Sequence, residues 1–218
     1  MGKETIRAID LEKLGRVHNP GAPKYLAHYV LKSAQRHKLV PWYQAALGME
    51  LVFENKQLSF MTYDGEHHRL AIISLPRAAR PMIAIARRYR KFYGLDHIAY
   101  NFGSLPELLE KWRSLSEQGI EPVWCINHGP TTSIYYEDPD GNRLEFQSDN
   151  FDTREQLQDF ALSMEFDKNP IGVNFDPAVL LAKLEAGVPV AELRKRGAGT
   201  PKGKKPVGGY RAINWRTL

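Results

Sequence analysis

Two histidines and one glutamate are the strongest candidates for metal chemistry. His28 and His97 both lie among apolar and aromatic neighbours in segments that are expected to be strands. Glu145 lies between Leu144 and Phe146, where a carboxylate is costly unless it is paired or bound to a cation. Two imidazoles and one carboxylate on one face leave metal positions open for substrate and oxygen, as in non-haem Fe(II) oxygenases. Zinc is the alternative, since such donors also serve hydrolytic zinc.

An internal repeat gives the reason to place these three residues together. Residues 25–75 and 95–148 both follow the order strand, helix, strand, strand, strand. The letters RLAIIS at residues 69–74 also match RLEFQS at residues 143–148. A duplicated βαβββ module explains both likenesses. We therefore expect equivalent strands of the two modules to be neighbours across a pseudo-twofold axis.

The repeat also predicts the number of metal sites. His28 and His97 take equivalent places near the middle of the first strand of each module. Glu145 lies on the last strand of the second module, where the first module has Ala71. Because this carboxylate occurs in one module and not in the other, we expect one metal site, built from His28, His97 and Glu145.

The elements that must position these residues follow from the hydrophobic pattern. The strands expected in the first module span residues 25–31, 50–54, 57–63 and 68–75. Those expected in the second module span residues 95–101, 121–126, 132–136 and 142–147. The helix of the first module is expected to start at Pro41 and to end at Gly48. The helix of the second module opens on a capping box formed by Ser104 and Glu107 and ends at Gly119.

The expected fold class is α+β: two tandem βαβββ modules form a metal-holding half-barrel, and a helical extension follows. The modules occupy residues 25–75 and 95–148. The other segments are an N-terminal extension, an amphipathic connector, the helical extension and a basic Gly/Pro-rich tail, at residues 1–24, 76–94, 149–190 and 191–218. A membrane-surface helix is the alternative for the connector.

Composition excludes several classes of protein. The 218 residues are 43% hydrophobic and 25% charged, with no apolar run near the roughly 20 residues of a membrane span. Residues 1–14 carry charges where a signal peptide needs an apolar stretch, so secretion is not expected. Cys125 is the only cysteine, which excludes an internal disulfide and multi-thiolate metal sites and fits the reducing cytoplasm.

The formal net charge of +5 comes from the C-terminal end of the chain. Residues 192–218 hold eight Lys or Arg and one Glu. The residues between these charges are mostly Gly and Pro rather than regularly spaced aromatics, so we expect a solvated or loosely docked extension and no nucleic-acid partner. Tyr210, Ile213 and Trp215 are its candidates for packing on the body.

A motif around the last two strands narrows the chemistry. His128 is followed seven residues later by Tyr135, then by Asp-Pro-Asp-Gly at residues 138–141 and by Glu145. In these residues the chain resembles the vicinal oxygen chelate superfamily and, within it, the type I extradiol (catechol 2,3-) dioxygenases. The Asp-Pro-Asp-Gly element is common to many members, whereas His128 and Tyr135 make the match to the extradiol enzymes specific. The resemblance covers residues 25–147.

This resemblance implies an Fe(II)-dependent enzyme that cleaves a catechol with O2 to a ring-opened semialdehyde. His28, His97 and Glu145 would bind the iron, with Mn or Zn as alternative metals. His128 would move a proton, and Tyr135 would hydrogen-bond a substrate oxygen. The implied partners are a small-molecule catechol and O2, with no nucleic acid and no membrane, and a homo-oligomer is compatible with them.

Several alternatives stay open at this point. His68 is expected to face the same cavity, either as a substrate contact or as a support for a ligand. Tyr135 as a plain core residue and His128 as the cap of a turn are the simpler interpretations of those two side chains. For the whole chain, the alternatives are a glyoxalase-like isomerase or thiol transferase using Zn, Ni or Mn, and a non-catalytic small-molecule binding protein of the same fold.

Overall fold

The computed structural model describes residues 23–90 and 94–213. Most of the expected N-terminal extension, residues 1–22, lies outside the described residues, as do residues 91–93 of the connector. The end of the basic tail, residues 214–218 with Trp215, lies outside them too. No helix among the described residues is long and apolar enough to cross a membrane.

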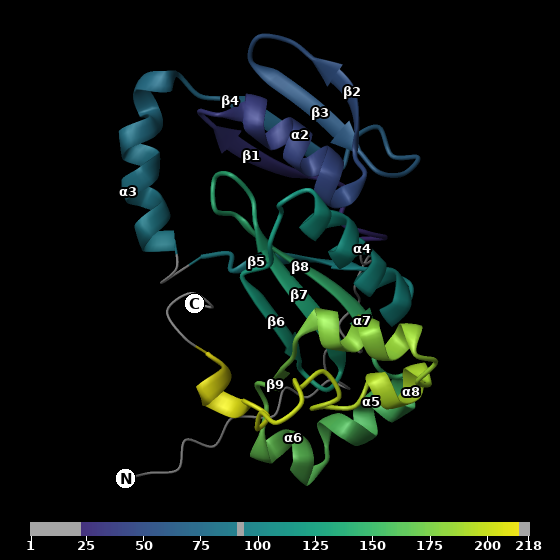
Figure 1. Cartoon of the computed structure of the whole chain (residues 1–218). Coiled ribbons are helices and arrows are strands. Elements are labelled where there is room, and N and C mark those ends of the chain that lie inside the picture. The colour runs from purple at the N-terminus through teal and green to yellow at the C-terminus, as the bar shows by residue number, and fades with distance from the viewer. Residues whose placement is uncertain (1–22, 91–93, 214–218) are drawn as a thin grey trace, which may run out of the picture.

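The first module has the expected order of elements. It consists of β1 (Tyr29–Ser33), α2 (Arg36–Leu47), β2 (Glu50–Glu54), β3 (Leu58–Thr62) and β4 (Leu70–Ser74). The four strands form one sheet in the order β1-β4-β3-β2, in which β1 and β4 are parallel (Figure 1).

Two boundaries in the first module differ from those expected. The helix α2 begins at Arg36, and Gln35 is its N-cap residue. Pro41 lies inside the helix and not at its start. The strand β1 begins at Tyr29, where the Tyr29 amide donates to the Arg69 carbonyl. His28 therefore lies just before the strand and not near its middle. Gly48 ends α2 as expected, at a φ of 63° that favours glycine.

The second module repeats the same plan. It consists of β5 (His97–Asn101), α4 (Leu105–Glu117), β6 (Trp124–Asn127), β7 (Thr131–Glu137) and β8 (Arg143–Asp149). With β9 (Val173–Asn174), these strands form a five-stranded sheet in the order β5-β8-β7-β6-β9. The Ser104 hydroxyl caps α4 by accepting a hydrogen bond from the Glu107 amide, so the expected capping box is confirmed. His97 is the first residue of β5, so it also lies outside the middle of the strand where it was expected.

The two modules share one hydrophobic core. Buried side chains of the first module that belong to it are Leu39, Tyr43, Ala46, Leu70 and Ile72. Those of the second module include Leu105, Leu108, Leu109, Leu144 and Phe146. The α+β class and the duplicated βαβββ module are thus confirmed. The two sheets are paired separately, with no ladder between β1 and β5 in the described part of the chain.

The Asp-Pro-Asp-Gly turn ties the modules together. One Asp138 oxygen accepts hydrogen bonds from the amides of Asp140 and Asn142, which closes the turn between β7 and β8. The other oxygen accepts from the Tyr43 hydroxyl of α2, at 3.1 Å. Gln35 donates to Asp140 across the same boundary. This motif therefore has a structural role here.

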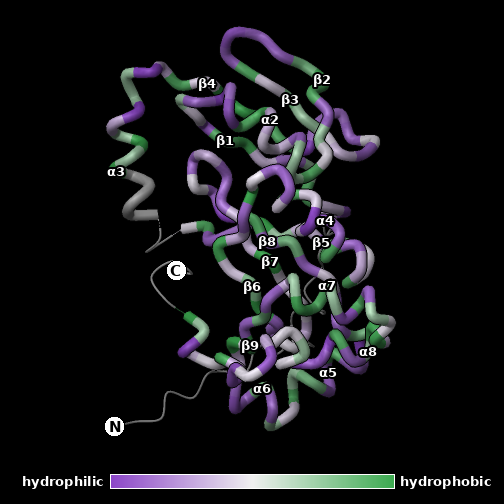
Figure 2. The backbone as a smooth tube through the Cα atoms, viewed as in Figure 1, coloured by the Kyte–Doolittle hydropathy of each residue, from purple (hydrophilic) through white to green (hydrophobic). Residues whose placement is uncertain are grey.

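The connector forms a helix that stands apart from both sheets. It runs through a short 3-10 turn, η1 (Arg77–Ala79), and then α3 (Arg80–Arg90) (Figure 1). The first part of α3, residues 80–85, carries both hydrophilic and hydrophobic residues (Figure 2). Met82 and Ile85 on this helix are exposed.

The C-terminal extension covers the far end of the second sheet. Its helices are α5 (Arg154–Ala161), α6 (Met164–Lys168), α7 (Pro177–Glu185) and α8 (Val190–Leu193), with a 3-10 turn η2 (Gly209–Ala212) (Figure 1). The described part of the basic tail is docked at some points and solvated at others: Leu193 and Ala212 are buried and the Asn174 amide donates to the Val207 carbonyl, whereas residues 202–207 are exposed. The Gly-rich composition that suggested a loose tail instead lets its backbone lie close to β9.

Candidate metal centre and active site

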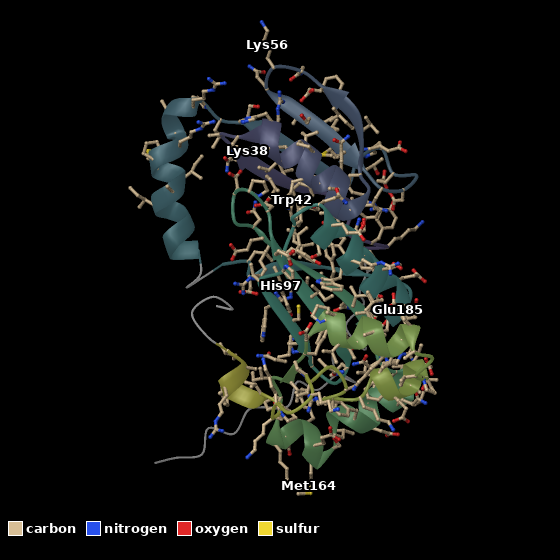
Figure 3. The ribbon with its side chains drawn as sticks, in the orientation of Figure 1. Lys38, Trp42, Lys56, His97, Met164 and Glu185 are labelled. Atoms are coloured by element: carbon tan, nitrogen blue, oxygen red, sulfur yellow. The ribbon has the colours of Figure 1, made fainter. Side chains whose placement is uncertain are left out.

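His97 and Glu145 form the centre of the site. The parallel pairing of β5 with β8 sets Ala99 opposite Glu145, and His97 lies two residues earlier on the same face of the sheet. His97 Nε2 lies 2.9 Å from Glu145 Oε2. Glu145 is only 5% exposed, and His97 lies in the middle of the molecule (Figure 3). The structure thus brings together two of the three expected metal ligands.

The surroundings of Glu145 keep it ionised. Burial raises the pKa of Glu145, but hydrogen bonds from His97, Ser133 and Tyr135 outweigh that effect and hold the pKa below its usual value. The hydrogen bond with Glu145 in turn raises the pKa of His97. A buried carboxylate that stays charged beside an imidazole is a suitable donor pair for a divalent cation.

The other nitrogen of His97 is held by a second carboxylate. His97 Nδ1 lies 2.6 Å from Asp96 Oδ2, so Nδ1 carries the hydrogen of this bond. A histidine whose Nδ1–H donates to a carboxylate is fixed in ring orientation, and Nε2, which donates to Glu145 here, is the atom that would bind a metal in place of its proton. Sequence reasoning missed Asp96, although its position directly before His97 was a usable signal.

His128 and Tyr135 form a hydrogen-bonded pair next to this centre. His128 Nδ1 donates to the Ile171 carbonyl at 2.5 Å, which leaves Nε2 as the acceptor facing the Tyr135 hydroxyl at 3.1 Å. Burial lowers the pKa of His128, so the ring is neutral near pH 7. The Arg196 guanidinium donates to the His128 backbone carbonyl. His128 is therefore a base held in one tautomer.

Tyr135 links the His97–Glu145 pair to His128. Its hydroxyl lies within hydrogen-bonding reach of both Glu145 and His128. Burial, together with the charge of Glu145, raises the pKa of Tyr135, so the phenol stays protonated. Its ring stacks on Trp124 with centroids 5.1 Å apart. Tyr136 faces the opposite side and packs on Phe146 in the core.

The first module contributes a separate group of rings. His28 is exposed and lies beside His68, with ring centroids 4.5 Å apart. His68 stacks on Phe60 at 4.2 Å, and its Nδ1 lies 2.5 Å from that of His67. Burial lowers the pKa of His68. His28 and His68 are thus brought together with each other.

His28 is not brought to the other two expected ligands. Among the residues that the structure describes, no group of three or more His, Cys, Asp or Glu side chains is placed to hold a metal ion. His97 and Glu145 fit two positions of a metal of the Fe(II) class. The expected third donor is not supplied to them by the same chain in this structure.

Contacts from the extension could not be read from local sequence. The Ile171 carbonyl that orients His128 belongs to the loop before β9. That loop approaches so closely that a Cβ on Gly172 would lie 2.3 Å from the Asn127 carbonyl oxygen. No periodicity or motif connects residues 171–172 with the second module. Their role depends on tertiary packing.

The comparisons with known proteins show the family to which the chain belongs. A family model described as the Glyoxalase/Bleomycin resistance protein/Dioxygenase superfamily matches residues 25–146. Biphenyl-2,3-diol 1,2-dioxygenase 2 of Rhodococcus globerulus is 42% identical over 168 residues, which cover 77% of this chain and 85% of that protein. Biphenyl-2,3-diol 1,2-dioxygenase 3 of the same organism is 41% identical over 171 residues, covering 78% of this chain and 87% of that protein.

Solved structures are more distant. The crystal structure of lactoylglutathione lyase from Agrobacterium tumefaciens is 18% identical, with a TM-score of 0.46. The match covers 59% of this chain and 96% of that chain.

Proposed function

Because this chain belongs to the glyoxalase/bleomycin resistance protein/dioxygenase superfamily, we propose that it is an extradiol dioxygenase that cleaves a catecholic ring with O2. A biphenyl-2,3-diol is the first substrate to try, since two relatives of 41–42% identity carry that substrate in their names. Both atoms of O2 enter the ring-opened product. The observation that carries the proposal is the contact of the His97–Glu145 pair with the His128–Tyr135 pair.

The metal we propose is Fe(II), with Mn or Zn as alternatives, held by His97, Glu145 and His28. A metal held there would supply Lewis acidity that lowers the pKa of the catechol hydroxyls, and it would leave positions open for the substrate and O2. Asp96 fixes the His97 ring so that Nε2 is the ligand atom. Because Glu145 is already ionised, its carboxylate can bind a metal ion without first losing a proton.

The chain's own acid–base groups suit the proton transfers of this reaction. The His128 ring is neutral and its Nδ1–H is held by the Ile171 carbonyl, so Nε2 carries no hydrogen and can take a proton from a catechol hydroxyl in place of the Tyr135 hydrogen bond. The Tyr135 phenol remains protonated and donates a hydrogen bond to a substrate oxygen. His68, beside His28 on the first module, is proposed as a substrate contact.

The burial of these groups limits access of bulk water. Tyr135 and Glu145 are 4% and 5% exposed. The half-buried indole of Trp124 stacks on Tyr135, and an apolar surface of this kind suits an aromatic substrate.

The proposal is tested by oxygen uptake. Protein loaded anaerobically with Fe(II) is mixed with catechol or biphenyl-2,3-diol, and O2 consumption is followed with the yellow colour of the ring-opened product. We expect uptake with at least one of these diols and none with resorcinol, whose hydroxyls are not adjacent and cannot chelate. Iron-loaded protein that consumes no O2 with any catechol contradicts the proposal and favours an isomerase, a transferase or a binding protein.

A further inference from the structure

We infer that Asn169 and Asn174, two side chains of the C-terminal extension, are positioning residues that hold the His128–Tyr135 pair in the geometry of proton transfer. The inference rests on the proposed function for the role of that pair. Both asparagines lie beyond residues 25–146, the part of the chain that the family model matches. Their action therefore comes from the extension and not from the two modules.

Asn169 holds the peptide group that orients His128. Its Oδ1 accepts a hydrogen bond from the Gly172 amide at 2.8 Å, and its Nδ2 donates to the Gly172 carbonyl, also at 2.8 Å. The Gly172 amide and the Ile171 carbonyl belong to one planar trans peptide group, so their directions are fixed relative to each other. Because the Ile171 carbonyl accepts from His128 Nδ1, the Asn169 side chain sets the direction of that acceptor.

The hydrogen bond to Asn169 also strengthens this acceptor. Donation by the amide of a peptide group polarises the carbonyl of the same group, and the bonds of such a chain reinforce one another. The chain here runs from His128 through the peptide group of Ile171 and Gly172 to Asn169. It favours the tautomer with hydrogen on Nδ1, which leaves Nε2 without hydrogen opposite the Tyr135 hydroxyl.

Asn169 is itself held by two other parts of the extension. Its backbone amide donates to the Glu165 and Phe166 carbonyls of α6, and its Oδ1 also accepts from the Gly209 amide of η2 at 3.1 Å. Gly172 lies so close to the second module that a Cβ on it would lie 2.8 Å from the backbone of residue 128. The peptide group before Gly172 therefore has little room to turn while Asn169 is in place.

Asn174 acts on the same two rings through an indole. The strand β9 lies beside β6 and sets Asn174 opposite Ile126 (Figure 1). Trp124 Nε1 donates to Asn174 Oδ1 at 2.9 Å. The Trp124 ring stacks on Tyr135 with centroids 5.1 Å apart, and it meets the His128 ring edge to face with centroids 5.8 Å apart. Because a partly buried indole N–H needs its acceptor, Asn174 fixes the ring on which both others pack.

Other contacts keep the extension docked when one asparagine is replaced. The Phe175 amide donates to the Cys125 carbonyl, and Phe175 and Leu180 are buried in the shared core. In the part of the chain that the structure describes, neither asparagine side chain is hydrogen-bonded to His97 or Glu145. Replacing an asparagine should therefore misplace the acid–base pair without removing the proposed metal ligands.

Nitrogen NMR of the metal-free protein tests the inference directly. The ¹⁵N shifts of the His128 ring, assigned by comparison with His128→Gln, show which nitrogen carries hydrogen at about pH 8, where the ring is neutral. We expect hydrogen on Nδ1 in the wild type and a mixture of tautomers in Asn169→Ala. Hydrogen on Nε2 in the wild type, or an unchanged tautomer in Asn169→Ala, overturns the inference. This measurement needs no iron, so an absence of O2 uptake would sink the proposed function alone.

A double-mutant cycle separates positioning from general stability. In iron-loaded protein, Asn169→Ala should lower kcat by about 10- to 100-fold at unchanged iron content. If Asn169 acts through His128, the same change in His128→Gln protein should have little further effect, because the group that it positions is gone. Equal falls in kcat in the two backgrounds would contradict the inference.

Asn174 offers a second pair of variants in case Asn169→Ala does not fold. Asn174→Asp keeps an oxygen acceptor for Trp124 Nε1, whereas Asn174→Leu has a similar volume and no acceptor. We expect faster exchange of the Trp124 indole hydrogen with water and a fall in kcat of about 10-fold in Asn174→Leu only. Equal behaviour of these two variants would contradict the role of Asn174.

Thr153→Ala is the matched control, because it also removes a side-chain hydrogen bond of the extension. The Thr153 hydroxyl caps α5 by accepting from the Gln156 amide. Its loss should lower stability and leave the His128 tautomer and kcat unchanged. A fall in kcat as large as in Asn169→Ala would show that any weakening of the extension slows turnover, and it would overturn the specific roles of the two asparagines.

Discussion

Glu145 and Ala71 occupy equivalent places on the last strands of the two modules, and both are buried, at 5% and 3% exposure. Around Glu145 the second module supplies hydrogen bonds from His97, Ser133 and Tyr135. Around Ala71 the paired residues are Val30 and Phe60, which offer no side-chain donor. The same fold therefore holds a buried carboxylate only in the module whose neighbouring side chains donate hydrogen bonds to it.

The difference extends to the histidines. His97 is fixed on one side by Asp96 and on the other by Glu145. The equivalent His28 has ring contacts with His67 and His68 and is exposed. One module thus holds its histidine between two carboxylates, while the other holds its histidine against two further histidines.

Exchanging the two equivalent residues should produce the largest effects. Glu145→Ala removes the charged donor, so we expect loss of most bound iron and of nearly all O2 uptake, measured by elemental analysis and an oxygen electrode. Ala71→Glu buries a carboxylate without partners, which should lower the free energy of unfolding by about 3–5 kcal/mol. If Ala71→Glu instead creates a second tightly bound metal and leaves stability unchanged, the contrast between the modules is wrong.

Replacing the base of the second module should slow turnover while leaving the metal in place. His128→Gln removes the proton acceptor at Nε2, and a positioned acid or base is typically worth about 10²–10⁴-fold in rate. We expect kcat to fall by that factor at unchanged iron content. Exposed His37 provides the matched control, since His37→Gln should leave kcat unaltered. Loss of iron in His128→Gln would make His128 a ligand.

Two adjacent tyrosines on β7 sharpen the comparison between the two faces of one sheet. Tyr135→Phe removes the donor shared by His128 and Glu145, and a hydrogen bond to a charged group is worth about 1.5–3 kcal/mol, so we expect a loss of roughly 10- to 100-fold in kcat/KM. The Tyr136 hydroxyl is buried on the core side and has no hydrogen-bond partner among the residues that the structure describes. Tyr136→Phe should therefore keep activity, and equal losses in both variants would contradict the assignment of faces.

The smallest expected effect concerns pH and the metal-free protein. Burial lowers the pKa of His128 in the folded state below its unfolded value of about 6.5. The folded state thus binds the proton less well, and the resulting stability is present above about pH 6.5 and is lost as pH falls through the lower, folded pKa. Urea titrations at about pH 7.5 and 5.5 should show a smaller drop in unfolding free energy for His128→Gln than for the wild type. An equal drop would mean that His128 is not desolvated.

The repeat and the caps were predictable because their causes are local. Ser104 caps α4 through the Glu107 amide, and Thr153 caps α5 through the Gln156 amide, as their spacing indicates. The pairing of His97 with Glu145 was also predictable, since a buried carboxylate requires a partner and the repeat shows which strands are equivalent.

The expectations that differ from the structure depended on contacts between segments that are distant in the sequence. The start of β1 depends on where β4 begins, because an edge strand exists only where its neighbour offers a ladder, and this moved His28 out of the strand. The docking of the tail depends on contacts such as the donation of Asn127 Nδ2 to the Arg194 carbonyl, which no local pattern encodes. The separation of His28 from Glu145 depends on how the two modules face each other, and their sequences specify their own sheets but not that placement.

The most direct test of the central claim is an isotope experiment on the reaction itself. Fe(II)-loaded protein is supplied with ¹⁸O2 and biphenyl-2,3-diol, and the ring-opened product is trapped and analysed by mass spectrometry. The proposed dioxygenase activity predicts two ¹⁸O atoms in each product molecule, apart from any that exchange with water, and one O2 consumed per diol. Product with one labelled oxygen atom that does not exchange, or diol turnover without O2 consumption, would contradict it.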